Sequence, residues 1–217
     1  MFIQGKRVTV RKLRRTDLLE MTKWRPFDDP LLDEANWPQR SLGDLNLWYS
    51  RFSDDPRRML CAVTDPSGRV IGSITLRERV GRRSARLGIT FGADFVDRGF
   101  GSEALALFLE YYFGELRYEK LVLDVAGHNQ RAIRVYRKLG FVTVGEHERS
   151  IGRSGTWSFL DDSEHADLRR FFRRDWMGRR WLICYDMELR REDWERQRKR
   201  HDGEGSLPDL TSVSTDG

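Results

Sequence analysis

The feature that most constrains this chain is a glycine-rich turn that opens directly into an amphipathic helical pattern. Glycine permits unusual backbone angles and lets a ligand approach the main chain closely. The unpaired N–H groups of a helix's first turn, together with the helix dipole, form a site for anions such as a pyrophosphate. A tight loop shaped only for stability explains the glycines equally well on their own. The turn reads Asp97-Arg98-Gly99-Phe100-Gly101-Ser102-Glu103-Ala104, and Leu105, Phe108 and Tyr112 continue the helical spacing.

Two common phosphate-binding motifs fit this turn poorly. The chain has no Gly-x-x-x-x-Gly-Lys sequence, which a P-loop requires. The dinucleotide fingerprint Gly-x-Gly-x-x-Ala is matched by Gly99, Gly101 and Ala104, and Asp124 lies near the distance expected for a ribose-binding acid. However, the preceding strand is expected to end near Phe91, about seven residues too early for that fold, and at least three strands come before it. The sequence therefore disfavours a dinucleotide site.

The chain as a whole predicts an α/β (α+β) domain with a mixed, mostly antiparallel sheet. Before the turn, the patterns predict a strand over 6–12, helices over 16–24 and 41–52, a hairpin of strands 58–64 and 69–78, and a strand over 84–92. After it, they predict helices over 101–114, 130–139 and 161–176, and strands over 120–125, 141–145 and 181–189. We expect one domain over residues 1–190 and a polar, largely disordered tail over 191–217.

Composition is that of a soluble globular protein, with 39% hydrophobic and 34% charged residues among 217. No apolar run reaches the roughly 18 residues of a membrane span, so we expect no membrane partner. Cys61 and Cys184 stand in separate strand-like runs, which predicts buried thiols rather than a disulfide or a metal site and suits the cytoplasm. The net charge of +5 suits a nucleic acid, an acidic acceptor or a phosphate-rich cofactor, but no nucleic-acid-binding signature accompanies it.

A second motif follows the glycine turn at a characteristic separation. Residues Asn129 to Phe141 read Asn-x-x-Ala-x-x-x-Tyr-x-x-x-Gly-Phe. With both motifs in this order, residues 6–149 resemble the GNAT superfamily of N-acetyltransferases, in particular its ribosomal-protein-alanine and polyamine branch. The resemblance implies a central sheet of about seven strands, flanked by helices and splayed in the middle to admit acetyl-CoA.

The resemblance also implies a role for each matching residue. The strand ending at Thr90 and Phe91 is expected to pair its backbone with the pantetheine arm of acetyl-CoA. The main-chain amides of Arg98, Gly99, Phe100, Gly101 and Ser102 are expected to hold the pyrophosphate, and Asn129 to bond the cofactor arm. Two positions depart from the family pattern, Val96 and Asp97, and an aspartate beside a pyrophosphate implies weaker or differently angled binding.

Tyr136 is the candidate acid. A departing thiolate, with a pKa of about 8.5, is readily protonated by a phenol of pKa about 10 placed against it. Asn129 and Tyr136 are two helical turns apart and share a helix face. From the residues alone, Asn129 is also a good helix cap and Tyr136 a good core aromatic.

The base that accepts the amine's proton is less defined. Asp124 occupies the place where some relatives carry a carboxylate base, although a solvated charge at a strand end explains it equally well. Glu78 and His128 are weaker alternatives. An α-amine with a pKa of about 8 is roughly a tenth neutral at pH 7, so such an acceptor needs little help.

Acceptor specificity is expected from the early helices, over 16–52, and from the segment 149–180. The arginines at 169, 170, 173 and 174 form one face of the predicted helix there, which suits either an acidic acceptor or plain solvation. The prediction is thus an enzyme that acetylates a peptide N-terminus or a small-molecule amine, with a homodimer possible. A non-catalytic acyl-CoA-binding module and a nucleic-acid binder are the alternatives.

Overall fold

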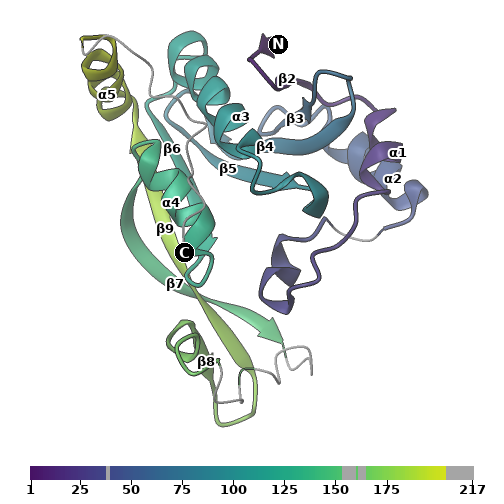
Figure 1. Cartoon of the computed structure of the whole chain (residues 1–217), viewed down its shortest axis with the longest axis vertical. Helices are drawn as coiled ribbons and strands as arrows, with labels where there is room; N and C mark the ends of the chain where they lie inside the picture. Colours follow the sequence, from purple (N-terminus) through teal and green to yellow (C-terminus); the bar gives the residue numbers. More distant parts are fainter. Residues whose placement is uncertain (38–39, 153–159, 161–164, 204–217) are drawn as a thin grey trace.

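The computed structural model describes residues 1–37, 40–152, 160 and 165–203, and these form one mixed sheet with helices on both sides (Figure 1). Within this part of the chain the sheet has nine strands, in the order β1-β2-β3-β4-β5-β6-β9-β7, with β8 also paired to β9. The strands are β1 (Phe2–Gln4), β2 (Thr9–Lys12), β3 (Met59–Thr64), β4 (Val70–Val80), β5 (Ser84–Phe91), β6 (Lys120–Ala126), β7 (Val142–Gly152), β8 (Phe172–Arg174) and β9 (Arg180–Arg190). The mixed, mostly antiparallel sheet predicted from the sequence is confirmed.

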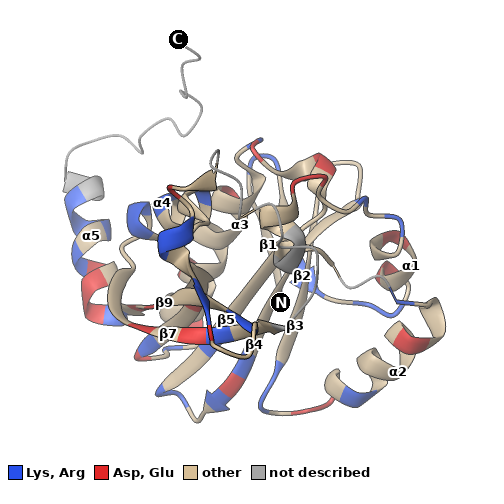
Figure 2. Cartoon of the chain, turned by 90° about the horizontal axis from the view of Figure 1, so that it is seen from below, with Lys and Arg blue, Asp and Glu red and all other residues tan. Residues whose placement is uncertain are grey.

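Helices cover the two faces of this sheet, with α3 and α4 on one side and α2 on the other (Figure 2). The helical elements are α1 (Asp17–Met21), η1 (Pro30–Ala35), α2 (Leu42–Phe52), η2 (Ala93–Phe95), α3 (Phe100–Leu109), η3 (Glu110–Glu115), α4 (Gln130–Lys138), η6 (Arg169–Phe171) and α5 (Arg191–Gly203). Helix α3 packs fully buried Leu105 and Phe108 into the core, and η3, which continues it, adds fully buried Tyr112. The helical spacing of these residues predicted this helix correctly.

The sheet opens between β5 and β6, which form its parallel pair. Their hydrogen-bonded register covers three residue pairs, from Ser84 opposite Lys120 to Arg86 opposite Val122. Beyond that point β5 continues to Phe91 and β6 to Ala126, each still paired on its outer side, to β4 and β9. The strands therefore splay into a V whose closed end lies at Arg86 and Val122, as the predicted fold requires.

The predicted helix over 161–176 is wrong where the structure describes it, and residues 161–164 lie outside the described part. Phe172 of the short strand β8 pairs with Leu182 of β9, and Trp176 is 91% exposed. The physical reason is turn chemistry. The Asp175 carboxylate accepts hydrogen bonds from the Met177 and Arg179 amides, closing a hairpin turn that overrides the helical spacing.

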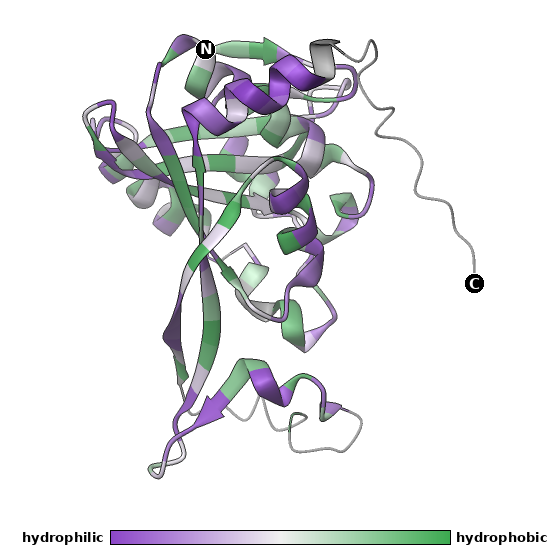
Figure 3. Ribbon diagram, turned by 90° about the vertical axis from the view of Figure 1, so that its left-hand side faces the viewer, coloured by the Kyte–Doolittle hydropathy of each residue, from purple (hydrophilic) through white to green (hydrophobic). Residues whose placement is uncertain are grey.

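Two strand predictions also change. The strand expected over 6–12 is broken, because the chain turns between β1 and β2 with the Gly5 amide bonded to the Val8 carbonyl. The strand expected over 141–145 is much longer, since β7 runs on to Gly152 beside β9. Figure 3 shows these two strands crossing and extending away from the main body towards β8.

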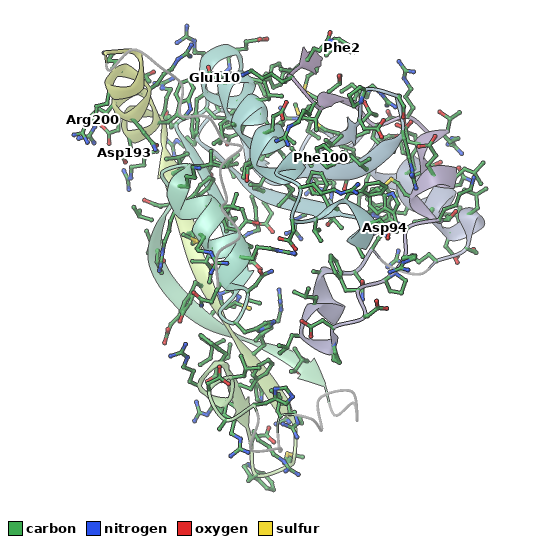
Figure 4. The ribbon with its side chains drawn as sticks, viewed as in Figure 1. Phe2, Asp94, Phe100, Glu110, Asp193 and Arg200 are labelled. Atoms are coloured by element: carbon green, nitrogen blue, oxygen red, sulfur yellow. The ribbon has the colours of Figure 1, made fainter. Side chains whose placement is uncertain are left out.

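The polar tail expected from residue 191 begins as a helix, which corrects part of that prediction. Trp194 of α5 is 9% exposed and its ring lies 5.5 Å from that of buried Phe113. Arg198 pairs with Glu110 near the end of α3, the end labelled in Figure 4. One aromatic anchor therefore joins 191–203 to the domain, and residues 204–217 lie outside the described part.

Two further expectations concerned the cysteines and a membrane partner. Cys61 and Cys184 are both buried, as expected, and burial raises the pKa of the Cys61 thiol to about 12. Among the described residues, none of the helices is both long enough and apolar enough to cross a membrane.

Candidate active site

The glycine loop, residues 97–102, has the backbone shape that its sequence predicted. Gly99 precedes α3 in the left-handed region with φ of 76°, and Asp97 is also left-handed with φ of 58°. This brings the chain round so that α3 starts at Phe100, labelled in Figure 4. The amides of Phe100, Gly101 and Ser102 belong to the first turn, where N–H groups have no partner within the helix. The loop therefore presents main-chain donors to an anion.

Hydrogen bonds from Arg7, which the sequence did not predict, hold this loop in place. Arg7 donates from Nη1 to the Arg98 carbonyl at 2.9 Å, and from Nε to the Glu103 carboxylate at 2.9 Å. The Arg7 amide bonds the same carboxylate at 2.8 Å. Arg7 and Glu103 stand 96 positions apart, so no local signal in the sequence joins them. Their contacts hold the first turn of α3 against the start of the chain.

The unusual Asp97 is matched by a cation. Its carboxylate lies 2.8 Å from Nη1 of Arg131, in the first turn of α4. Both side chains are partly exposed, so the pair adds little stability. It does offset the negative charge that the sequence placed beside the anion-binding amides, and it ties the glycine loop to α4.

Thr90 and Phe91 lie at the open end of β5, where the V is widest. They pair with Ser73 and Gly72 of β4 on one side, and the β6 register no longer reaches them on the other. The Phe91 ring fills the space over Gly72, where an added Cβ would lie 2.6 Å from the ring, and it also lies beside Gly101. Phe91 therefore positions the glycine loop through its side chain, while its backbone faces the opening.

Asn129 caps α4. Its side-chain oxygen accepts a hydrogen bond from the Ala132 amide at 3.1 Å, which satisfies one of the free donors of that helix. The capping role that the residue type suggested is thus present in the structure. The Asn129 side-chain amide group is a hydrogen-bond donor besides.

Tyr136 lies on α4 with 8% of its surface exposed, and its ring is 5.8 Å from that of Phe141. Among the described residues, the structure gives its hydroxyl no hydrogen-bond partner. Burial raises the pKa of Tyr136 to about 12, and the charge of Asp124 adds to the increase. The phenol is therefore protonated throughout the physiological pH range.

Asp124 is held between two arginines. Its Oδ1 lies 3.0 Å from Nη1 of Arg86, and its Oδ2 lies 3.3 Å from Nη1 of Arg149. The carboxylate is 20% exposed, so these ion pairs are partly shielded from water. The Asp124 carboxylate thus ties Arg86 of β5 to Arg149 of β7 across the V.

The two weaker candidates for the base are engaged elsewhere. Glu78 is 68% exposed and lies 3.2 Å from Arg86. His128 bonds the Leu31 carbonyl through Nε2 at 2.7 Å, and its ring stacks on Phe172. Neither contact directs the side chain towards Tyr136.

Comparison with known proteins identifies the family. The model of the acetyltransferase (GNAT) domain matches residues 7–142, which include the glycine loop, Asp124 and the second motif. This chain belongs to the GNAT acetyltransferases. As in that family, it is an acyltransferase enzyme.

Several relatives have named activities. The spermidine N(1)-acetyltransferase of Vibrio cholerae is 27% identical over 166 residues, covering 76% of this chain and 91% of that enzyme. The L-amino acid N-acetyltransferase AaaT of Escherichia coli is 31% identical over 116 residues, covering 52% and 70%. A crystal structure of the V. cholerae enzyme with CoA and spermine matches with a TM-score of 0.65 at 22% identity, covering 88% of this chain and 99% of that one. That likeness shows a shared fold.

The described residues fit a coenzyme A thioester. Gly99 leaves a cradle that a Cβ would fill, since an added Cβ would lie 2.8 Å from Nη2 of Arg7. The amides of the first turn of α3 suit a pyrophosphate, and the unpaired side of β5 from Leu87 to Phe91 suits an extended amide-bearing arm.

Proposed function

We propose that this protein is an N-acetyltransferase that moves the acetyl group of acetyl-CoA to a primary amine by direct attack. The observation that carries the proposal is the V between β5 and β6, which opens beside the glycine loop. In the reaction the amine nitrogen bonds to the acetyl carbon, the carbon–sulfur bond breaks, the thiolate gains a proton and the nitrogen loses one. This balance needs proton transfers and no metal.

The glycine loop and β5 hold the donor in this proposal. The amides of Arg98, Gly99, Phe100, Gly101 and Ser102 bind the pyrophosphate. The backbone at Thr90 and Phe91 pairs with the pantetheine arm, and Asn129 donates to it from its side-chain amide. Arg131 supports the loop through Asp97, so the carboxylate there does not oppose binding.

Tyr136 acts as the acid that protonates the leaving thiolate. Its hydroxyl has no competing protein partner among the described residues, and its raised pKa keeps the proton available at any physiological pH. A pKa of about 12 also makes it a weaker acid, so the thiolate must accept the proton as the carbon–sulfur bond breaks.

We assign no single residue as the base that removes the amine's proton. Asp124 is the predicted base, but it would have to give up an arginine to accept a proton. The cations around it favour the neutral amine, because a like charge nearby lowers the pKa of an ammonium group. We therefore propose that an acceptor with a low pKa reacts with little help from a dedicated base.

Three further features belong to the proposal. We place the enzyme in the cytoplasm, where the buried thiols of Cys61 and Cys184 stay reduced. We keep a homodimer as a possible assembly. A dodecameric structure of the V. cholerae spermidine enzyme is among the solved relatives.

The test is a free-thiol release screen of the full chain with acetyl-CoA and primary amines. The panel includes spermidine, amino acids and short peptides with free N-termini. Release that depends on both the amine and the protein supports the proposal. Tight binding of acetyl-CoA by calorimetry, without release from any amine, would instead identify a non-catalytic acyl-CoA-binding module.

A further inference from the structure

Three arginines of β4, β5 and β7 are connected near the closed end of the V by strand pairing and by Asp124 of β6. Arg77 of β4 and Arg86 of β5 stand directly opposite each other, so both side chains project from the same face of the sheet. Asp124 of β6 binds Arg86 and also Arg149 of β7. We call Arg77, Arg86 and Arg149, with Asp124 between them, the arginine cluster.

Arg77 differs from the other two arginines. Its Nε is buried, and the structure gives its side chain no hydrogen bond or ion pair within the described residues. A buried charged donor without a partner costs about 1–3 kcal/mol or more. A guanidinium group offers a planar fork of donors that matches a carboxylate. The half-buried Arg77 guanidinium, with its Nε unpaired, can therefore gain a hydrogen-bond partner from an anionic ligand.

Positive charge outweighs negative charge around this fork. Glu78 is 68% exposed and pairs with Arg86. Leu76 pairs with Met59, so the next step along β4 brings Arg77 beside Arg58, which pairs with Asp55 and covers the Phe52 ring at 3.9 Å. Among the described residues, Asp55 and Glu78 thus each have an arginine partner, and Arg77 has no carboxylate partner.

Two acidic residues of the early loop, Asp28 and Asp29, have partners within their own segment. Asp28 is 93% exposed and lies 3.7 Å from Arg25. Asp29 accepts a hydrogen bond from the Leu31 amide within its own loop. Both carboxylates are engaged with their own segment rather than with the cluster.

The arginine cluster also lies where the amine acceptor has to approach the thioester. The β5–β6 pairing ends at Arg86 and Val122, so the cluster flanks the closed end of the V. Gly88 follows Arg86 on the same face of β5 and carries no side chain, so the floor between the cluster and the opening is formed there by Thr75 opposite it. A donor held in the V would carry its thioester past this floor.

We propose that the arginine cluster binds a carboxylate of the amine acceptor, with Arg77 as the specificity-determining residue. The acceptor class is then an amine with a carboxylate nearby, either an amino acid or an acidic peptide, and not a polyamine. This rests on the proposed acetyl transfer. Asp124 serves as a positioning residue that holds Arg86 and Arg149, and a polycation meets like charge at the same place.

The experiment compares acetylation of four acceptors by thiol release. They are glutamate, a tetrapeptide with a free N-terminus and acidic side chains, the same peptide with amide side chains, and spermidine. The variants are Arg77→Gln, Arg77→Lys and, as a matched loss of charge, Arg83→Gln on the exposed β4–β5 turn. Calorimetry of the acidic peptide on the CoA-saturated protein gives a readout independent of turnover.

We expect the acidic acceptors to be used at least tenfold better than the amide peptide or spermidine. Arg77→Gln should remove that preference through KM and weaken peptide binding about tenfold, Arg77→Lys should restore part of it, and Arg83→Gln should change neither. Glutamate and the acidic peptide distinguish a small-molecule from a peptide acceptor. Spermidine as the better acceptor, unaltered by Arg77→Gln, would overturn the inference and leave acetyl transfer standing. No release from any amine would instead remove the proposed function.

The melting temperature guards against a folding artefact. Because Arg77 has no partner among the described residues, Arg77→Gln should leave it unchanged or raise it. A large decrease would show a structural role for Arg77 and count against the proposal.

Discussion

The glycine loop and the arginine cluster lie at opposite ends of the same V, and they are built in different ways. The loop is one continuous stretch, 97–102, whose donors are main-chain amides set by backbone angles. The cluster takes one residue from each of β4, β5, β6 and β7, and its donors are side chains. The loop therefore suits a constant ligand, the diphosphate of the donor, whereas the cluster can change with the acceptor by single substitutions that leave the fold intact.

The largest effect should come from the group proposed to act between these two regions. Tyr136→Phe should lower kcat about a hundredfold, the scale of general acid catalysis, with little change in acetyl-CoA affinity. Stability should hardly change, because the hydroxyl has no hydrogen-bond partner among the described residues. Steady-state kinetics and calorimetry measure the two parts. Tyr111→Phe is the matched control, and equal kcat in the two variants would remove Tyr136 from the mechanism.

Substitutions at Gly99 and Gly101 test whether the loop binds acetyl-CoA through its left-handed backbone conformation. Gly99→Ala should weaken acetyl-CoA binding about tenfold and cost roughly 1–2 kcal/mol of stability, because a Cβ is strained at φ of 76°. Its Cβ would also displace Arg7. Gly101→Ala is the control, since its Cβ would only touch Phe91 at 3.5 Å. Calorimetry with acetyl-CoA and thermal unfolding compare them, and identical losses would show that the left-handed backbone is not the determinant.

The smallest of the three effects should show whether Asp124 acts as the base or only positions Arg86 and Arg149. Asp124→Asn keeps the size of the side chain but removes the charge that holds Arg86 and Arg149. A positioning residue predicts a several-fold increase in the KM of an acidic acceptor with kcat nearly unchanged. A decrease in kcat of a hundredfold with every acceptor, at unchanged KM, would make Asp124 the base.

The same contrast explains how much of the site the sequence could predict. The loop was predictable because its information is local: glycines of a particular spacing, followed by apolar residues on one helix face. The same holds for Asn129 and Tyr136, which lie on one short helix. Arg7 and Arg149 had no such signal, because each acts through a partner that only the folded sheet brings near. Arg131 stood inside the second motif, yet its partner Asp97 was recognisable only as a departure from the family pattern.

The elements of the fold also differ in how well the sequence predicted them. Elements with strong periodicity, such as β6 and α4, were predicted close to their observed bounds. The segment 165–176 was not, because its aromatic and arginine residues have helical spacing while Asp175 closes a hairpin turn. The start of α5 was also missed. Its polar composition suggested disorder, and a single tryptophan packed on Phe113 provides the anchor.

The separation of β5 and β6 has a thermodynamic consequence for donor binding. Breaking an existing strand ladder would cost about 1 kcal/mol for each net hydrogen bond lost. Here the β5–β6 ladder already stops at Arg86 and Val122, so the incoming thioester can pair with the unpaired edge of β5 without breaking any strand hydrogen bond. We therefore expect association in a single kinetic phase that depends linearly on donor concentration, with no slow isomerisation beforehand.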